Sequence, residues 1–257
     1  MLVAERADGS IAGYADLADQ ALEHERFSID LRVPPGEQAR PIAAALLDSL
    51  EALSVELATR EASVRVFLSS VDELGRFVEQ RGYKPFRHSF RMQIEFDAEL
   101  PTPVWPEGLA VRTFVPGEDD EAVYEASDAA FVDHFEHARQ PYESWRGWVF
   151  GESFDPSLWF LAVDGEEIAG VSLCRGEGGA DGELGWVNTL GVRPAWRRRG
   201  LGRALLLHSF AEFRARGKRG AGLGVDALNP TGAVGLYEGA GMHVARRYDQ
   251  YAKTFSA

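Results

Sequence analysis

The sequence predicts an α/β protein with a mixed sheet, in which one fold occurs twice in tandem. The first observation is an apolar run at 186–192 that leads through a short basic loop into an apolar-periodic stretch from Ala204 onward. This order is typical of a strand, a turn and a helix. The second observation is an internal repeat, because 32–47 aligns without a gap on 191–206. Self-similarity over such a distance indicates a repeated structural unit.

The repeat is carried by apolar residues and prolines that keep one offset. Five residues of the first segment match five of the second: Val33, Pro35, Ala45, Leu46 and Leu47 match Val192, Pro194, Ala204, Leu205 and Leu206. The same offset carries Gly82 onto Gly241. Upstream, 2–13 is similar to 160–170 with a small change in length. The two copies are therefore expected to contain the same elements in the same order.

The two copies differ in length. We expect three parts, an N-terminal copy, a Pro-rich segment that is typical of a stiff linker, and a C-terminal copy, at 1–96, 97–108 and 109–257. The C-terminal copy opens with an apolar strand at 109–114 and a helix that begins near the acids of 118–121. Those acids suit the positive end of a helix. Nothing before Leu2 corresponds to this opening, so the N-terminal copy is expected to be incomplete.

The basic loop has the chemistry of an anion site. It reads Arg197-Arg198-Arg199-Gly200-Leu201-Gly202. The first amides of a helix have no partner within it and carry partial positive charge, so they can hold an anion. Glycine leaves this backbone open to a ligand. Because the arginines add full charges, the loop predicts a ligand that carries phosphate, although the P-loop and G-x-G-x-x-G patterns are both absent.

Two motifs together carry a resemblance to a known family. The loop has the form R-x-x-G-x-G, and a second strand at 223–228 is followed by residues spaced as A-x-x-L-Y-x-x-x-G, namely Ala233, Leu236, Tyr237 and Gly241. In this order they resemble the pyrophosphate loop and signature of the GCN5-related N-acetyltransferases (GNAT). The resemblance covers 109–257. It implies splayed parallel strands, acetyl-CoA as donor, and acetyl transfer to the primary amine of a small molecule by direct attack in a ternary complex.

The resemblance also implies which residues hold acetyl-CoA. The pantetheine falls on the backbone of 190–192, and the pyrophosphate falls on the amides of 198–203. The side chain of Asn229 either contacts the ligand or only caps a helix, and Tyr237 is either the acid that protonates the thiolate or a core aromatic. The expected cofactor-binding residues are Leu190, Gly191, Val192, Arg197, Arg198, Arg199, Gly200, Leu201, Gly202, Arg203, Asn229 and Tyr237.

The general base is the point at which this sequence departs from the family pattern. Many members place a glutamate where Trp186 stands, and Asn188 cannot act as a base. The alternatives are an ordered water molecule or a side chain from 133–136, of which His134 titrates in the useful range. Without a third ligand, His134 and His137 predict no metal site. The expected acceptor-binding residues are Asp133, His134, Glu136, Trp186 and Asn188.

The N-terminal copy lacks the groups that mark the anion site. Pro41 replaces Gly200 and has no amide hydrogen to donate. The repeat also places Ala43, Ser70 and Val78 at the positions of Gly202, Asn229 and Tyr237. We therefore expect a degenerate first copy that binds the cofactor poorly and is structural, or that lines the acceptor site.

Composition narrows the classes of partner. The chain has 257 residues and a formal net charge of −13, which argues against nonspecific nucleic-acid binding. Its basic residues gather at 193–219, which suits a polyanionic cofactor. Cys174, the single cysteine, excludes an internal disulfide framework. No apolar run is long enough to span a bilayer, and 1–6 lacks the features of a signal peptide. A cytoplasmic protein without membrane contact is the expectation, as a monomer or homodimer.

Two alternatives to the general acetyltransferase remain open. The tandem arrangement, with a degenerate first copy, resembles the mycothiol synthases, which would make the acceptor a cysteinyl pseudodisaccharide. Trp186 and the shortened first copy depart from that pattern. The other alternative is a non-catalytic module that holds acetyl-CoA without turnover. Tyr237 favours the enzyme, and the missing glutamate favours the module.

Overall fold

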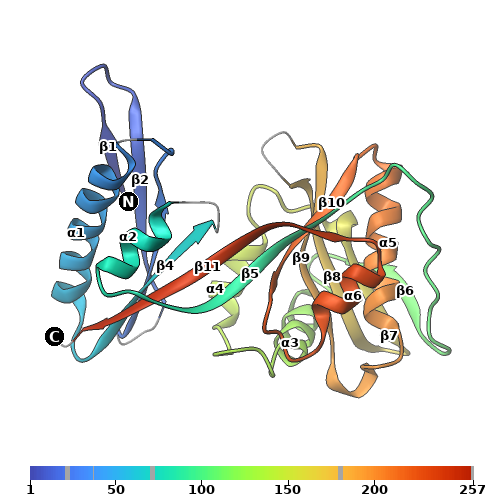
Figure 1. Ribbon diagram of the computed structural model, residues 1–257. Coiled ribbons are helices and arrows are strands. Elements are labelled where there is room, and N and C mark those ends of the chain that lie inside the picture. The colour runs from blue at the N-terminus through green and yellow to red at the C-terminus, as the bar shows by residue number, and fades with distance from the viewer. Residues whose placement is uncertain (21–23, 37, 70–72, 179–181, 256–257) are drawn as a thin grey trace. The chain divides into compact units, whose positions relative to one another are not determined.

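The computed structural model describes residues 1–20, 24–36, 38–69, 73–178 and 182–255 (Figure 1). The chain forms two compact units. Unit 1 comprises Met1–Phe90 and Arg246–Ala257, and unit 2 comprises Arg91–Ala245. The division falls inside β5 (Lys84–Glu95) and inside β11 (His243–Phe255), so each of these strands contributes residues to both units.

Unit 1 is a sheet with two helices. In chain order its elements are β1 (Leu2–Glu5), β2 (Ile11–Asp19), β3 (Arg26–Arg32), α1 (Ala39–Leu57), β4 (Ala62–Ser69) and α2 (Leu74–Gln80). The strands are ordered β1-β2-β3-β4-β11. β3 and β4 are parallel, whereas the other pairs are antiparallel.

Alternation of apolar residues builds the core of unit 1. Phe27, Ile29 and Leu31 of β3 are buried in turn, as the period of two in a strand requires. α1 packs on this layer through buried residues that recur at helical spacing, among them Leu46, Leu47 and Leu50. The sequence of unit 1 thus places one apolar face of α1 on one apolar face of the sheet.

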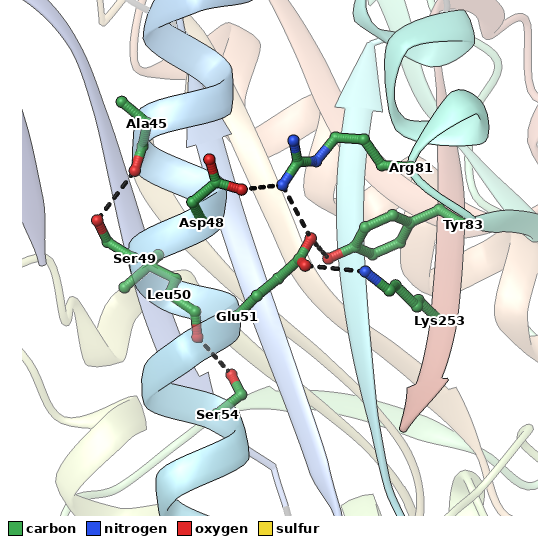
Figure 2. Close-up of polar contacts among 9 residues, drawn as sticks. All are labelled: Ala45, Asp48, Ser49, Leu50, Glu51, Ser54, Arg81, Tyr83 and Lys253. Carbon is green, nitrogen blue, oxygen red and sulfur yellow. Dashed lines mark hydrogen bonds and ion pairs between the residues drawn. The ribbon is translucent and has the colours of Figure 1, made fainter. Parts of the chain in front are cut away.

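A polar network ties α1 to β11 and to the residues just before β5 (Figure 2). The carboxylate of Glu51 accepts hydrogen bonds from the Tyr83 hydroxyl at 3.0 Å and from Nζ of Lys253 at 2.9 Å. Arg81 binds Asp48 and approaches Glu51 at 3.9 Å. Burial and the adjacent Glu51 carboxylate raise the pKa of Tyr83. Because the ring of Tyr83 is fully buried, this network fixes β5 and β11 to α1 from inside the unit.

Unit 2 is a larger sheet with helices on both faces. Its strands are β6 (Ala110–Thr113), β7 (Trp159–Asp164), β8 (Glu167–Gly178), β9 (Leu184–Val192) and β10 (Gly220–Asp226), ordered β5-β10-β9-β8-β7-β6. Its helices are α3 (Asp120–Ala130), α4 (Tyr142–Val149), α5 (Leu201–Ala215) and α6 (Ala233–Gly239), with short 3-10 turns at Pro156–Leu158 and Pro194–Trp196. β9 and β10 are parallel.

α5 and α3 cover opposite faces of the unit 2 sheet (Figure 1). A Cβ atom at Gly185 would lie 2.3 Å from the ring of Phe213 on α5. One at Gly191 would lie 2.8 Å from Ala130 on α3. Both helices therefore approach β9 closely because glycine stands at these two strand positions. The Pro-rich segment also packs on α5, since Trp105 lies edge-on to His208 with the ring centroids 5.8 Å apart.

The tandem repeat expected from the sequence is present in the structure. The order β1-β2-β3-α1-β4-α2-β5 recurs as β7-β8-β9-α5-β10-α6-β11. The last strands are exchanged. β11 pairs with β4 in unit 1, and β5 lies beside β10 in unit 2, where the amide of Phe96 donates to the Arg219 carbonyl at 2.8 Å. Each repeat therefore supplies the final strand of the sheet that contains the other repeat.

α1, with 19 residues, is the longest helix of the described chain. Over the described residues, no helix combines the length and the apolar character that crossing a bilayer requires.

Candidate active site

The parallel strands β9 and β10 separate part of the way along their length. They pair from Leu184 to Val187 on β9, opposite Gly220 to Leu223 on β10. Beyond these positions β9 continues to Val192 and β10 to Asp226, but no further pair between them is found among the described residues. On the edges that face each other, the backbone groups at the carboxyl ends of β9 and β10 therefore do not pair with the opposite strand among the described residues. The splayed parallel strands expected from the sequence are confirmed.

A β-bulge at Asn188 accompanies this separation. The pairing of β8 with β9 shifts between Leu173, which faces Thr189, and Cys174, which faces Val187, so Asn188 is skipped. A bulge bends its strand and reverses the alternation of faces beyond it. Trp186 and Gly191 are five residues apart, an odd spacing that would place them on opposite faces of a regular strand. With the bulge, both lie on the face that α3 covers.

The loop between β9 and α5 presents unpaired backbone amides. Arg198 has φ 63° and Gly200 has φ 87°, and the helix begins at Leu201. The first bond of the helix runs from the amide of Ala204 to the Gly200 carbonyl at 3.0 Å. Within the described residues, the amides from Arg198 to Arg203 make no bond to a backbone carbonyl. The loop is therefore a helix start whose donors remain available to an anion.

The two glycines of this loop have different physical roles. A Cβ atom at Gly200 would meet nothing within 4 Å, but its φ of 87° is one that other residues adopt at a cost. At Gly202 a Cβ atom would lie 3.2 Å from Leu236 on α6 and 3.6 Å from Val192. Gly200 thus sets the turn, whereas Gly202 permits close packing of α5, α6 and the end of β9.

Arg197 is engaged with the protein rather than directed to solvent. Its Nε donates to the Val192 carbonyl at 3.1 Å, and its terminal nitrogens donate to Asp133 at 2.5 Å and to the Ala130 carbonyl at 3.1 Å. One guanidinium thus joins the end of β9 to the end of α3. Arg198 and Arg199 are exposed, and Arg203 is half-buried.

His134 and Asn229 are brought together although 95 positions separate them. The Asn229 side-chain nitrogen lies 3.3 Å from Nε2 of His134, and Oδ1 of Asn229 accepts from the Thr231 amide at 2.8 Å. That second bond fixes the orientation of the amide, so its nitrogen is the donor and Nε2 the acceptor. The arrangement requires a neutral imidazole. Burial lowers the pKa of His134, against the opposing effect of Asp226.

Tyr237 is the buried residue of α6, with 8% of its surface exposed. Burial raises the pKa of its phenol to about 12, and no other group contributes to the shift. The hydroxyl is therefore protonated throughout the neutral range. Asn229 lies in the loop between β10 and α6, and its side-chain oxygen accepts from both the amide and the hydroxyl of Thr231.

The remaining expected acceptor residues are dispersed around β9 and the segment after α3. Asn188 is exposed at the bulge, and Asp133 is occupied by Arg197. Glu136 is exposed with φ 52°. Trp186 is half-buried, and the guanidinium carbons of two arginines lie over its ring, Arg91 at 5.0 Å and Arg175 at 6.0 Å from the centroid. No sequence motif marks these arginines, because they reach Trp186 from β5 and β8.

Comparison with known proteins gives consistent results. Residues 121–242 match the model of the Acetyltransferase (GNAT) family. A mycothiol acetyltransferase of Thermobispora bispora is 35% identical over 82% of this chain and 71% of its own length. One from Kineococcus radiotolerans is 35% identical over 95% and 78%. A GCN5-related N-acetyltransferase structure from Sphaerobacter thermophilus has a TM-score of 0.83 at 34% identity, covering 99% of this chain and 80% of that one.

A fifth likeness concerns the fold alone. The structure of a tandem GNAT protein from the clavulanic acid biosynthesis pathway has a TM-score of 0.71 at 18% identity. It covers 97% of this chain and 81% of that chain. The fold of this chain is therefore shared by a tandem GNAT protein of low sequence identity.

Proposed function

Because this chain belongs to the GNAT family of acetyltransferases, whose donor is acetyl-CoA, we propose that it acetylates the primary amine of a small molecule by direct attack in a ternary complex. The observation that carries the proposal is the coincidence of two features in unit 2. β9 and β10 part after Val187 and Leu223, and the loop that follows β9 leaves its amides unpaired. An extended thioester with a diphosphate at one end fits both features.

The residues of the loop and of the parted strand suit this donor. The backbone of Leu190, Gly191 and Val192 lies beyond the last β9–β10 pair, where it would hold the pantetheine. The amides from Arg198 to Arg203 would hold the diphosphate, aided by the exposed charges of Arg198 and Arg199. Arg197 would act differently, by holding the loop on Asp133 and the Val192 carbonyl. Bound acetyl-CoA supplies an activated acyl group with a thiolate leaving group.

Two side chains suit the proton transfers. A neutral imidazole is needed to accept the proton of the attacking amine, and burial keeps His134 neutral at pH 7. A protonated phenol is needed to donate to the departing thiolate, and the pKa of Tyr237, about 12, keeps it protonated. Nε2 of His134 is the unprotonated ring nitrogen and accepts from the Asn229 amide, so the attacking amine would have to displace that amide before Nε2 can take its proton.

A second candidate function follows from the relatives. The mycothiol acetyltransferases of Thermobispora bispora and Kineococcus radiotolerans match most of this chain at 35% identity, which favours the cysteinyl pseudodisaccharide of mycothiol synthesis as the acceptor. Trp186 stands where the family resemblance places an acidic residue. We therefore propose primary amines of small molecules as the acceptor class. The pseudodisaccharide is one of the amines to be tested.

The test is thiol release from acetyl-CoA with a panel of small amines. We expect turnover for at least one amine, and we expect Tyr237→Phe to lower kcat about tenfold or more while the Kd of acetyl-CoA changes less than about twofold. A matched control is Tyr142→Phe, which removes a hydroxyl from α4. Tight binding of acetyl-CoA with no turnover for any amine would support a non-catalytic module instead.

A further inference from the structure

We propose that Arg91, Trp186 and Arg175 form an acceptor subsite that takes a carboxylate, so that the amine substrate is an amino acid or a similar anionic amine. The inference rests on the proposed acetyl transfer for its account of turnover, but the subsite can be tested by binding alone. All three residues belong to unit 2.

The sequence makes room for the indole on the sheet. A Cβ atom at Gly222 would lie 2.7 Å from the Trp186 ring, and one at Gly178 would lie 2.8 Å from the Cβ atom of Trp186. Any larger residue at either position would collide with Trp186 in its present place. Glycine on β8 and on β10 therefore lets this large side chain lie along the surface of the sheet, between the two flanking strands.

Two positive charges converge on this ring. Arg91 comes from β5 and Arg175 from β8, and their guanidinium carbons lie 5.0 and 6.0 Å from the ring centroid. The face of an aromatic ring attracts a guanidinium but does not occupy its N–H donors with an acceptor. Over the part of the chain that the structure describes, neither guanidinium forms an ion pair or a hydrogen bond, and Nε of Arg175 is buried without a partner.

The N–H donors of these two guanidiniums lack an anionic hydrogen-bond acceptor among the described residues. Burying a donor without a partner is unfavourable. A carboxylate would supply the missing acceptor, because its planar pair of oxygens matches the planar fork of a guanidinium. The local charge is also opposite to that of the chain as a whole, whose formal net charge is −13.

The subsite lies on the face of β9 from which an acceptor would approach the donor. The bulge at Asn188 places Trp186 on the same face as Gly191, where α3 packs. His134 belongs to the segment that follows α3. An anionic amine would thus place its carboxylate at the arginines and its amine toward the parted end of the strands.

The first experiment measures binding without turnover. Benzoate and benzamide share a ring that can stack on Trp186 but differ in charge, and both are titrated calorimetrically into the full chain at low salt. We expect benzoate to bind at least about tenfold more tightly than benzamide, which corresponds to one unit in log Kd. Arg175→Gln and Arg91→Gln should each remove most of that difference, whereas Arg146→Gln, which removes an arginine stacked on Phe150, should not.

Three results of that experiment would overturn the proposal. Equal binding of benzoate and benzamide would mean that the cluster only fills space. An unchanged preference in both arginine variants would place any anion elsewhere. A loss of acetyl-CoA affinity of tenfold or more in Arg175→Gln would assign the guanidiniums to the phosphates of the donor.

The second experiment measures turnover. Acceptor amino acids are compared with their own amides, and we expect the acid to have the higher kcat/KM by about tenfold or more. Arg175→Gln should raise KM for the acid and leave the amide unaffected. Amides that are acetylated as well as the acids would overturn the subsite. Benzoate binding without acetylation of any amine would instead count against the proposed function alone.

Discussion

The two parallel strand pairs, β3–β4 in unit 1 and β9–β10 in unit 2, have the same topology and different ends. β3 pairs with β4 as far as Asp30, close to the end of β3 at Arg32. β9 pairs with β10 only as far as Val187, well before the end of β9 at Val192, among the described residues. The pairing of β2 with β3 has no register shift, whereas β8 with β9 skips Asn188. One extra residue thus accompanies the difference between a closed and a parted strand pair.

The starts of α1 and α5, the helices that follow β3 and β9, also differ between the two units. α1 begins at Ala39, which the repeat aligns with Arg198, so residues that form a loop in unit 2 are already helical in unit 1. The amide of Ala39 donates to Gly36 and that of Ile42 donates to Gln38, at 2.9 and 3.1 Å, and Pro41 has no amide hydrogen. The comparison teaches that the same fold leaves the first amides of this helix unbonded to backbone carbonyls only where the helix starts late.

The largest effect is expected when the loop of unit 2 is made like that of unit 1. Gly200→Pro removes an amide hydrogen and demands a φ near −65° where the backbone has 87°. We expect the Kd of acetyl-CoA to rise about 100-fold, because a charge-assisted hydrogen bond of about 1.5–3 kcal/mol is lost and the turn is altered. Calorimetry measures the change, and circular dichroism checks that the variant is folded. An affinity within threefold of the native value would place the diphosphate elsewhere.

The next largest effect is expected on catalysis at His134. His134→Gln should lower kcat about 100-fold, which is within the range for loss of a general base. Since burial lowers the pKa of His134, the base stays neutral below the ordinary histidine value of about 6.5. The acidic limb of kcat/KM against pH should therefore lie below that value. An acidic limb above it, or full activity in His134→Gln, would assign the base to water or to another side chain.

A smaller effect is expected on stability when the polar network of unit 1 is opened. Glu51→Gln removes the charge that Lys253 and Arg81 face, so we expect the free energy of unfolding to fall by about 1–3 kcal/mol. Urea denaturation measures this loss. Because the network belongs to unit 1 alone, the Kd of acetyl-CoA should stay within about twofold. A large change in that Kd would mean that unit 1 takes part in donor binding.

The smallest effect is expected from the reverse change in unit 1. Pro41→Gly restores an amide but leaves β3 and β4 paired and the helix starting at Ala39. We expect acetyl-CoA to bind with the same stoichiometry as before, one per chain, by calorimetry. A second binding event in this variant would show that the proline alone, rather than the strand pairing, prevents unit 1 from binding the donor.

The sequence predicted those features that short segments encode. The strand, basic loop and helix at 186–215 are local, and the repeat carried the order of elements to unit 1. The sequence alone could not predict that the Arg197 guanidinium binds Asp133 and the Ala130 carbonyl, because these contacts depend on where α3 ends in space. Arg91 and Arg175 were missed for the same reason.

Other expectations were limited by the same lack of three-dimensional information. The exchange of β5 and β11 between the units leaves no trace in composition or periodicity, because it depends on pairing between segments far apart in the sequence. Gly202 was expected to clear the way for a ligand, but its position against Leu236 shows that it makes room for α6. Val78 is fully buried in the core of unit 1, and Ser70 lies outside the described residues.

The most direct test of the account is amide hydrogen–deuterium exchange with and without acetyl-CoA. We predict that exchange slows in the segment 197–204, at the start of α5, and is unchanged in 38–44, at the start of α1. Protection of 38–44, or unchanged exchange throughout 197–204 at saturating acetyl-CoA, would contradict it.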